Sequence, residues 1–203
     1  MSTDRYRTLA GEGHGQLREK ASRFIGAAFP MGDEDDFKQR LQALVKEHHG
    51  ARHFCYAWVL GDAGERHRAN DAGEPAGTAG RPILNRAQAL GLTYCGVVVV
   101  RYFGGTLLGK PGLVRAYGEA AALALEAAPV KEVVARGTVV VTCTYAQMEP
   151  VRNAVLGMEG EVLGMDLSDT CRLTLAIPHG RIDGLLGTWR AQGIVAERAD
   201  HLK

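Results

Sequence analysis

The spacing of apolar and polar residues predicts alternating strands and helices over the first 130 residues. Stretches with apolar residues at every second position, or with continuous apolar residues, predict strands over residues 6–10, 16–29 (as two segments), 53–60, 65–69 and 94–103. The last of these is rich in valine, which is typical of a central strand buried on both faces. Apolar residues at helical spacing predict helices over residues 33–49, 79–90 and 112–128.

From about Lys131 the predicted elements follow a second order. We expect a long strand at 133–145, a helix at 148–156, strands at 161–167 and 171–178, a helix at 181–192 and a last strand at 194–199. This β-α-β-β-α-β order is that of ferredoxin-like domains. The sequence therefore predicts an α+β protein with two domains, residues 1–130 and 131–203.

Composition and charge narrow the possible functions. The formal net charge is +1, so any attraction to nucleic acid or to a membrane must be local. The four cysteines, Cys55, Cys95, Cys143 and Cys171, are widely separated in apolar stretches, which indicates buried, reduced thiols. No stretch resembles a signal peptide or a membrane span, so we expect a cytoplasmic protein without membrane contact.

The candidate chemistry is concentrated between Asp71 and Tyr117, a segment dense in glycine. From Pro75 to Gly118 the charged residues are all cationic, namely Arg81, Arg86, Arg101, Lys110 and Arg115. Residues 104–111 nearly match a phosphate loop, but Pro111 stands where the hydroxyl ligand of magnesium would be. We therefore predict a site for an anion, phosphate or carboxylate, and not a nucleotide triphosphatase.

Candidate residues for binding this anion or a nucleic acid lie within the same glycine-rich segment. Amides at the start of the helix expected from Gly112, together with nearby cations, suit a phosphate. Tyrosines in the same segment could stack on bases, although packing in the core is the alternative. The full set is Arg81, Arg101, Tyr102, Gly104, Gly105, Lys110, Gly112, Arg115 and Tyr117.

Three residues of the preceding loop, Asp71, Glu74 and Thr78, are the candidates for catalysis. Paired carboxylates can act as general acid and base or bind a hard cation. Alternatively, Glu74 pairs with Arg101 or Arg115 to brace the loop, Asp71 caps a turn and Thr78 caps the next helix. We expect no cofactor and no bound metal.

The adjacent His48 and His49, with His53 nearby, could suggest a metal site. Neighbouring residues on a helix point about 100° apart, which is poor chelate geometry. We therefore interpret this cluster as imidazoles at a helix C-terminus, where a positive charge is favourable.

Four ordered motifs, Ser22–Gly26, Ala51–Ala57, Asp71–Leu84 and Arg101–Tyr117, resemble those of the YigZ/Impact family. The resemblance implies a first domain like the second domain of a small-subunit ribosomal protein, with a left-handed β-α-β arrangement. It also implies a second domain like the last domain of elongation factor G, and a role linked to translation. Eukaryotic relatives bind a translation activator, but with a different additional domain.

Two departures from the family pattern affect the predicted chemistry. Ala72 stands where the family usually has a second Asp, which weakens a catalytic or metal-binding pair. Lys110-Pro-Gly112 stands where Thr-Gly-Gly is common, so the similarity to a phosphate loop is accidental.

Our first hypothesis is a non-catalytic regulatory protein that binds RNA, or a ribosome-associated protein. A small anionic ligand is a second possibility for the same segment. From the enzyme class, the alternative is a dipeptidase-like hydrolase that uses Asp71 and Glu74. A third reading is a protein-interaction module that acts through the C-terminal domain.

Overall fold

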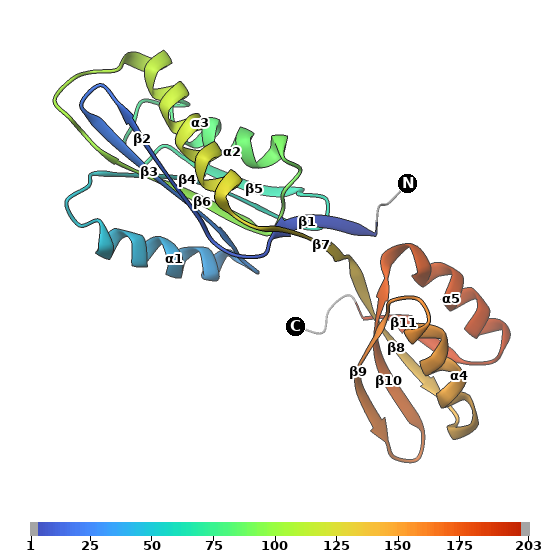
Figure 1. The fold of residues 1–203 in the computed structure, drawn as a ribbon. Helices are drawn as coiled ribbons and strands as arrows, with labels where there is room; N and C mark the ends of the chain where they lie inside the picture. Colours follow the sequence, from blue (N-terminus) through green and yellow to red (C-terminus); the bar gives the residue numbers. More distant parts are fainter. Residues whose placement is uncertain (1–3, 200–203) are drawn as a thin grey trace. The chain divides into compact units, whose positions relative to one another are not determined.

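The computed structural model describes residues 4–199, and the chain is an α+β protein (Figure 1). These residues fall into two compact units, one of residues 6–133 and one of residues 4–5 with 134–199. The chain passes between the units twice, within strands β1 (Arg5–Leu9) and β7 (Val130–Val134), which pair with each other. Within the described residues, no helix is long and apolar enough to cross a membrane.

The unit of residues 6–133 is built on a five-stranded antiparallel sheet with the order β2-β3-β6-β4-β5. Its strands are β2 (Gly13–Glu19), β3 (Ser22–Pro30), β4 (His53–Leu60), β5 (Arg66–Asn70) and β6 (Cys95–Tyr102). The valine-rich strand β6 is central, as its composition predicted.

Helices cover both faces of this sheet (Figure 1). Helix α1 (Glu34–Glu47) lies on one face, where Phe37 packs in a cluster with Trp58 and Val98. Helices α2 (Gly80–Ala89) and α3 (Gly109–Ala127) lie on the other face, above alternate residues of the same strands, such as Val97. Because both faces of β6 are covered, neither side of the strand needs polar residues.

Helix α3 approaches the sheet closely because both surfaces carry small residues. Its buried face is rich in alanine, including Ala120 and Ala124. The strand beneath presents Gly26, and a Cβ atom added there would overlap the carbonyl oxygen of Ala120. One turn before this contact, the Tyr117 ring of α3 packs edge-on against Phe24 of β3, at the end of the sheet where the candidate residues lie.

The second unit has the ferredoxin-like order that the sequence predicted. Its four antiparallel strands are ordered β11-β8-β10-β9, and two helices follow the first and third strands of the unit. The elements are β8 (Arg136–Cys143), α4 (Tyr145–Leu156), β9 (Glu161–Leu167), β10 (Cys171–Pro178), α5 (His179–Ala191) and β11 (Val195–Arg198). Trp189 and Ile182 of α5 pack on alternate residues of β8 and β10.

Three predicted boundaries were wrong, each for a local reason. The strand expected at 133–145 is two strands, because β7 pairs with β1 and β8 with β10 and β11. Helix α4 begins at Tyr145, where the Gln147 side chain accepts a hydrogen bond from the Thr144 amide. Helix α3 begins at Gly109 and so takes Pro111 into its first turn, a position that proline tolerates.

The close contact of α3 with the sheet predicts an asymmetric response to added methyl groups. We expect Gly26→Ala to lower the free energy of unfolding by about 1–3 kcal/mol, because the rigid helix backbone leaves no space. Gly118→Ala, inside α3, is the matched control, since the nearest atom to its Cβ would be Arg86 Nε at 3.5 Å. Urea unfolding followed by circular dichroism measures both. Equal stabilities for the two variants would contradict this packing.

Candidate functional site

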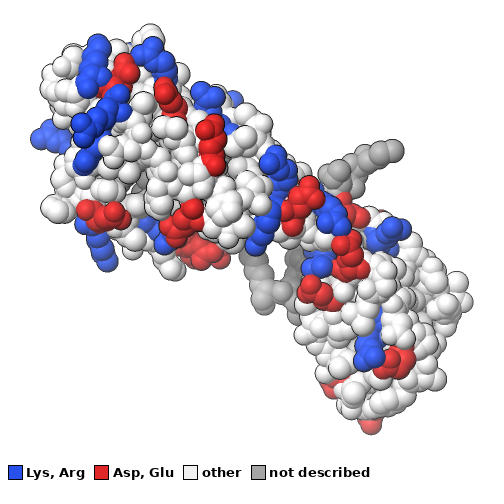
Figure 2. All heavy atoms as spheres, in the orientation of Figure 1, with Lys and Arg blue, Asp and Glu red and all other residues white. Residues whose placement is uncertain are grey.

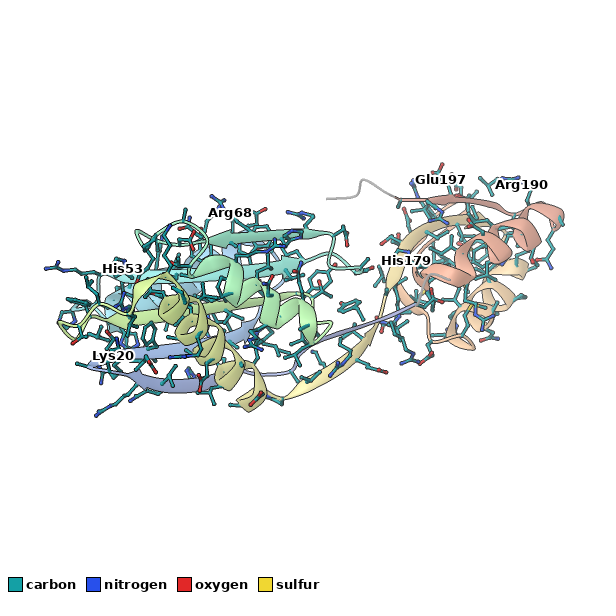
Figure 3. The ribbon with its side chains drawn as sticks, turned by 90° about the horizontal axis from the view of Figure 1, so that it is seen from above. Lys20, His53, Arg68, His179, Arg190 and Glu197 are labelled. Atoms are coloured by element: carbon teal, nitrogen blue, oxygen red, sulfur yellow. The ribbon has the colours of Figure 1, made fainter. Side chains whose placement is uncertain are left out.

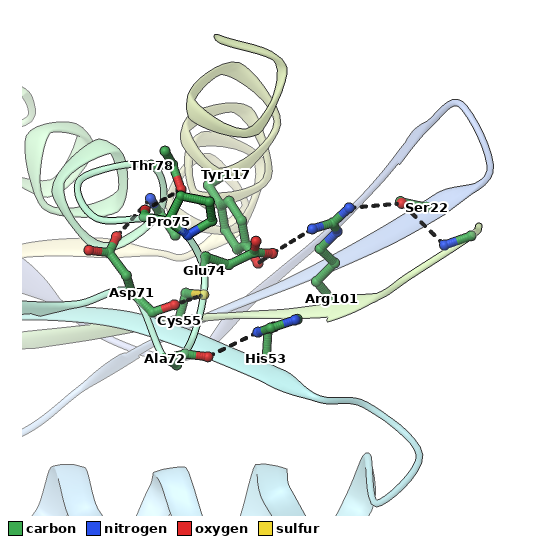
Figure 4. Close-up of polar contacts among 12 residues, drawn as sticks. Ser22, His53, Cys55, Asp71, Ala72, Glu74, Pro75, Thr78, Arg101 and Tyr117 are labelled. Atoms are coloured by element: carbon green, nitrogen blue, oxygen red, sulfur yellow. Dashed lines mark hydrogen bonds and ion pairs between the residues drawn. The ribbon is translucent and has the colours of Figure 1, made fainter. Parts of the chain in front are cut away.

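The candidate site lies at one end of the sheet, on the face that carries α2 and α3. Register places Phe24, Arg101 and His53 side by side on the neighbouring strands β3, β6 and β4. The loop between β5 and α2, which begins at Asp71, lies beside Arg101 and His53 (Figure 4). The site therefore combines residues far apart in the sequence.

Asp71 organises the loop that follows it and the start of α2. Its Oδ1 accepts hydrogen bonds from the amides of Ala79 at 2.9 Å and Gly80 at 2.8 Å, and its Oδ2 accepts one from Gly77 at 2.9 Å. Burial acts to raise the pKa of this carboxyl, but the three amide bonds outweigh it, and the pKa is lowered. Asp71 is thus an ionised capping residue, with both oxygens engaged.

Glu74 forms a buried ion pair with Arg101 (Figure 4). Arg101 Nη1 lies 2.6 Å from Glu74 Oε1, and the two side chains are only 6% and 5% exposed. The Tyr117 hydroxyl donates to the same oxygen at 2.8 Å. Burial, followed by the neighbouring Cys55 and Glu74, raises the pKa of Tyr117, which keeps it a hydrogen-bond donor.

Ser22 extends this network to the hairpin between β2 and β3. Its Oγ accepts hydrogen bonds from Arg101 Nη2 at 3.4 Å and from the Gly104 amide at 3.3 Å. A Cβ atom on Gly104 would overlap the backbone of Ala21. Gly104 is therefore required for the close approach of loop and hairpin, and its amide is directed at Ser22 instead of an outside anion.

Several predicted roles need correction. Arg101 and Tyr117 are 5% and 0% exposed, so neither presents a surface to a phosphate or a base. Tyr102 follows Arg101 on the strand and so faces the α1 side, where it contacts His48 and the guanidinium of Arg23. These three residues do not form the binding surface that the sequence suggested.

Two further predictions, about helix starts, were also wrong. Thr78 does not cap α2, because its hydroxyl donates to the Pro75 carbonyl at 2.6 Å and Asp71 binds the helix amides. Gly112 is the fourth residue of α3, so its amide lies within the helix. Gly105 adopts a left-handed φ of 83° and belongs to the loop.

A pocket of about 420 Å³ opens between the Asp71 loop and the loop that precedes α3. The ion pair of Glu74 and Arg101 and the side chain of His53 supply polar walls. Lys110 is the cation on its lining that is not in this pair. The apolar part of the lining is formed by Pro75, Phe103, Leu107, Leu108 and Leu113.

His53 is held in one orientation within this lining. Its Nδ1 lies 3.0 Å from the Ala72 carbonyl oxygen, which can only accept a hydrogen bond. Nδ1 must therefore carry the proton, and in the neutral ring Nε2 is an acceptor. His53 starts strand β4, as the predicted strand at 53–60 has it, and so lies apart from His48 and His49 at the end of α1. His48 alone is the C-cap there.

Next to the pocket lies a surface that we call the cationic rim, formed by Lys20, Phe103, Leu107, Lys110 and Arg115. It shares Phe103, Leu107 and Lys110 with the pocket lining. Lys20 Nζ donates to the Leu107 carbonyl at 3.3 Å, and Arg115 pairs with Glu19 at 2.9 Å. Phe103 is 53% and Leu107 82% exposed. Lysine and arginine side chains gather at this end of the unit in Figure 2, and Figure 3 shows Lys20 and His53 at the same end. Arg81, a further candidate, is exposed on α2.

Sequence reasoning missed Ser22, Lys20 and the pocket role of His53. Lys20 and Ser22 lie about 80 residues before their partners, so no local spacing connects them. The sequence placed His53 correctly at the start of a strand, but its contact with the Ala72 carbonyl, 19 residues on, has no signal in local spacing.

The low pKa of Asp71 predicts a pH-dependent contribution to stability. The folded-state pKa lies below the ordinary value of 3.8, so this contribution is present above about pH 4 and is lost as the pH falls through the folded pKa. We expect Asp71→Asn to cost about 1–2 kcal/mol at pH 7 and progressively less below pH 4.

Urea unfolding at pH 7 and at pH 2.5 measures this, with Asp166→Asn on the exposed surface of β9 as the control. An Asp71→Asn penalty of the same size at both pH values would contradict the capping role.

The buried ion pair predicts a large cost when one partner is neutralised. We expect Glu74→Gln to lower the free energy of unfolding by about 3 kcal/mol, because Arg101 is left charged and buried. Replacing both residues, by Gln and Met, should recover part of this loss. Glu19→Gln breaks the ion pair with Arg115, which is more exposed than that of Glu74 and Arg101, and should cost less than about 1 kcal/mol. Similar costs for Glu74→Gln and Glu19→Gln in urea unfolding would refute the central role of the pair.

Comparison with known proteins agrees with this architecture. The Impact N-terminal domain model matches residues 20–125, which include the whole candidate site. The chain is 35% identical over 166 residues to the IMPACT family member YigZ of Escherichia coli (strain K12), covering 80% of this chain and 81% of that one. It is 36% identical to an IMPACT family member of Haemophilus influenzae, with 81% of each chain covered.

A solved structure described as that of a hypothetical protein is similar over the whole chain. Its TM-score is 0.74 at 28% sequence identity, and the match covers 99% of this chain and 100% of the other. The motifs, the domain match and these relatives lead to one conclusion: the chain belongs to the Impact family.

Proposed function

We propose that this protein is a non-catalytic, cytoplasmic regulatory protein that binds single-stranded RNA through the cationic rim. The observation that carries the proposal is the exposed Phe103, which lines the same pocket as Lys110 and Leu107. Lys20 reaches this surface through its hydrogen bond to the Leu107 carbonyl, and residues 75–118 contain no Asp or Glu. An aromatic ring among cations is the usual means of binding an unpaired strand, since the ring stacks on a base and the cations neutralise phosphates.

The geometry of the carboxylates favours binding over hydrolysis. Both oxygens of Asp71 accept backbone amides, and Glu74 is neutralised by Arg101. A general acid or base needs a carboxyl group that can exchange its proton with a substrate. The hydrolase hypothesis therefore has less support in this site than the binding hypothesis.

The family resemblance adds support for a role near the translation machinery. Translation involves many single-stranded RNA segments, and sequence-independent contacts of the kind made by the rim suit them. Because the net charge of the chain is only +1, we propose modest affinity that falls with salt concentration.

Binding of a fluorescent single-stranded RNA of eight nucleotides, measured by anisotropy at several salt concentrations, tests the proposal. Lys20→Ala/Lys110→Ala should weaken binding and reduce the slope of log affinity against log salt by about 1.4. Phe103→Ala should weaken binding about tenfold with little change of slope, because it removes stacking and no charge.

The matched control is Arg68→Ala/Arg190→Ala, which removes two exposed cations that are not part of the rim, one on β5 and one on α5. Duplex RNA provides a second comparison, since its paired bases cannot stack on Phe103. Equal losses for the rim and control variants, or stronger binding of the duplex, would refute the rim as the RNA-binding surface.

A further inference from the structure

The pocket beside the cationic rim has a distribution of polar groups that the rim does not use. Its wall offers two acceptors. One is Nε2 of His53, which accepts in the neutral ring because Nδ1 carries the proton, and the other is the carboxylate of Glu74, whose bonds to Arg101 and Tyr117 both fall on Oε1. A carboxylate keeps further acceptor capacity on its second oxygen. These acceptors select a ligand with N–H or O–H donors.

The charge of the pocket restricts the ligand further. Glu74 and Arg101 neutralise each other, so they attract neither an ammonium group nor a carboxylate strongly. Lys110 remains as the cation of the lining, at the start of α3. The complementary ligand is therefore an anion whose hydrogen-bond donors are neutral, which disfavours zwitterions such as free amino acids.

The apolar lining supplies the third requirement. Phe103, Leu107, Leu108 and Leu113 border a space of about 420 Å³, within the range of small-molecule pockets. Flat rings bury well against leucine and phenylalanine, and Phe103 is partly exposed where the pocket meets the rim.

We infer that the pocket binds a nucleotide, with its base between the apolar residues and His53 and its phosphate near Lys110. The base supplies neutral N–H donors and a flat apolar face, and the phosphate supplies the negative charge. Such a nucleotide could be free or could be one unstacked residue of an RNA strand, and in the second case the inference rests on the proposed function. His53 then selects among bases by the donor that meets Nε2.

Three probes separate the two sources: adenosine monophosphate, an eight-nucleotide single-stranded RNA, and the same RNA with abasic residues. His53→Phe keeps a ring of similar shape and removes the acceptor, and Leu108→Trp fills the pocket from a half-exposed position. The matched control is His67→Phe, which changes an exposed histidine of β5. Calorimetry measures binding of the monophosphate, and anisotropy measures binding of the RNAs.

We expect the monophosphate to bind, and His53→Phe and Leu108→Trp to weaken it about 3- to 10-fold while His67→Phe does not. If an RNA residue also occupies the pocket, the same variants weaken the intact RNA and leave the abasic RNA unchanged. Binding of the monophosphate without binding of RNA would support the pocket and overturn the rim.

The opposite pattern would overturn the pocket alone. RNA binding that is equal for intact and abasic strands, with no binding of the monophosphate, would leave the rim as an electrostatic surface and refute a nucleotide site. Unchanged affinity of the monophosphate in both pocket variants would refute it as well.

Discussion

The buried ion pair between Glu74 and Arg101 is the constraint on which the rest of the candidate site depends. Two charges removed from water are costly unless their partners satisfy them closely. Here Tyr117 adds a hydrogen bond to the carboxylate and Ser22 one to the guanidinium. The four residues come from the Asp71 loop, β6, α3 and β3, so the requirement to satisfy one pair of charges fixes four segments relative to one another.

The same constraint determines which cations of the glycine-rich segment can act on a ligand. A count of charges along the sequence treats Arg101 as equal to Lys110 and Arg115. In the folded unit Arg101 is neutralised inside, whereas Lys110 lines the pocket and Arg115 is exposed and paired with Glu19. The positive surface is therefore smaller than the sequence indicates and is extended by Lys20, from the hairpin. Its position next to an apolar pocket is what distinguishes it from an ordinary solvated patch.

Periodicity predicted the fold well and the site in part. The valine-rich β6 and the order of helices and strands along the ferredoxin-like unit follow from patterns within each segment. The sequence does not show which face of the sheet each residue of a strand lies on. Arg101 and Tyr102 point to opposite sides of β6, and only the pairing of Arg101 with Phe24 shows that Arg101 is on the side of α2 and α3. The sequence made Tyr117 a candidate for stacking on a base, because helical spacing alone does not show that its face of α3 packs on Phe24. Long-range partners such as Ser22 have no signal in local spacing.

In the sequence, Ala72 stands out as a missing carboxylate, whereas in the folded unit it is the backbone of this residue that shapes the loop. Ala72 has a left-handed φ of 45°, a conformation that asparagine and aspartate adopt more readily than alanine. Its amide donates a hydrogen bond to the Asn70 side chain at 2.8 Å, and its carbonyl oxygen accepts one from His53 and so orients that ring. The backbone at this position thus serves the site whatever the side chain. The aspartate that is usual in the family suits the same backbone shape, so replacing it by alanine removes a charge but preserves the turn that places His53 and Glu74.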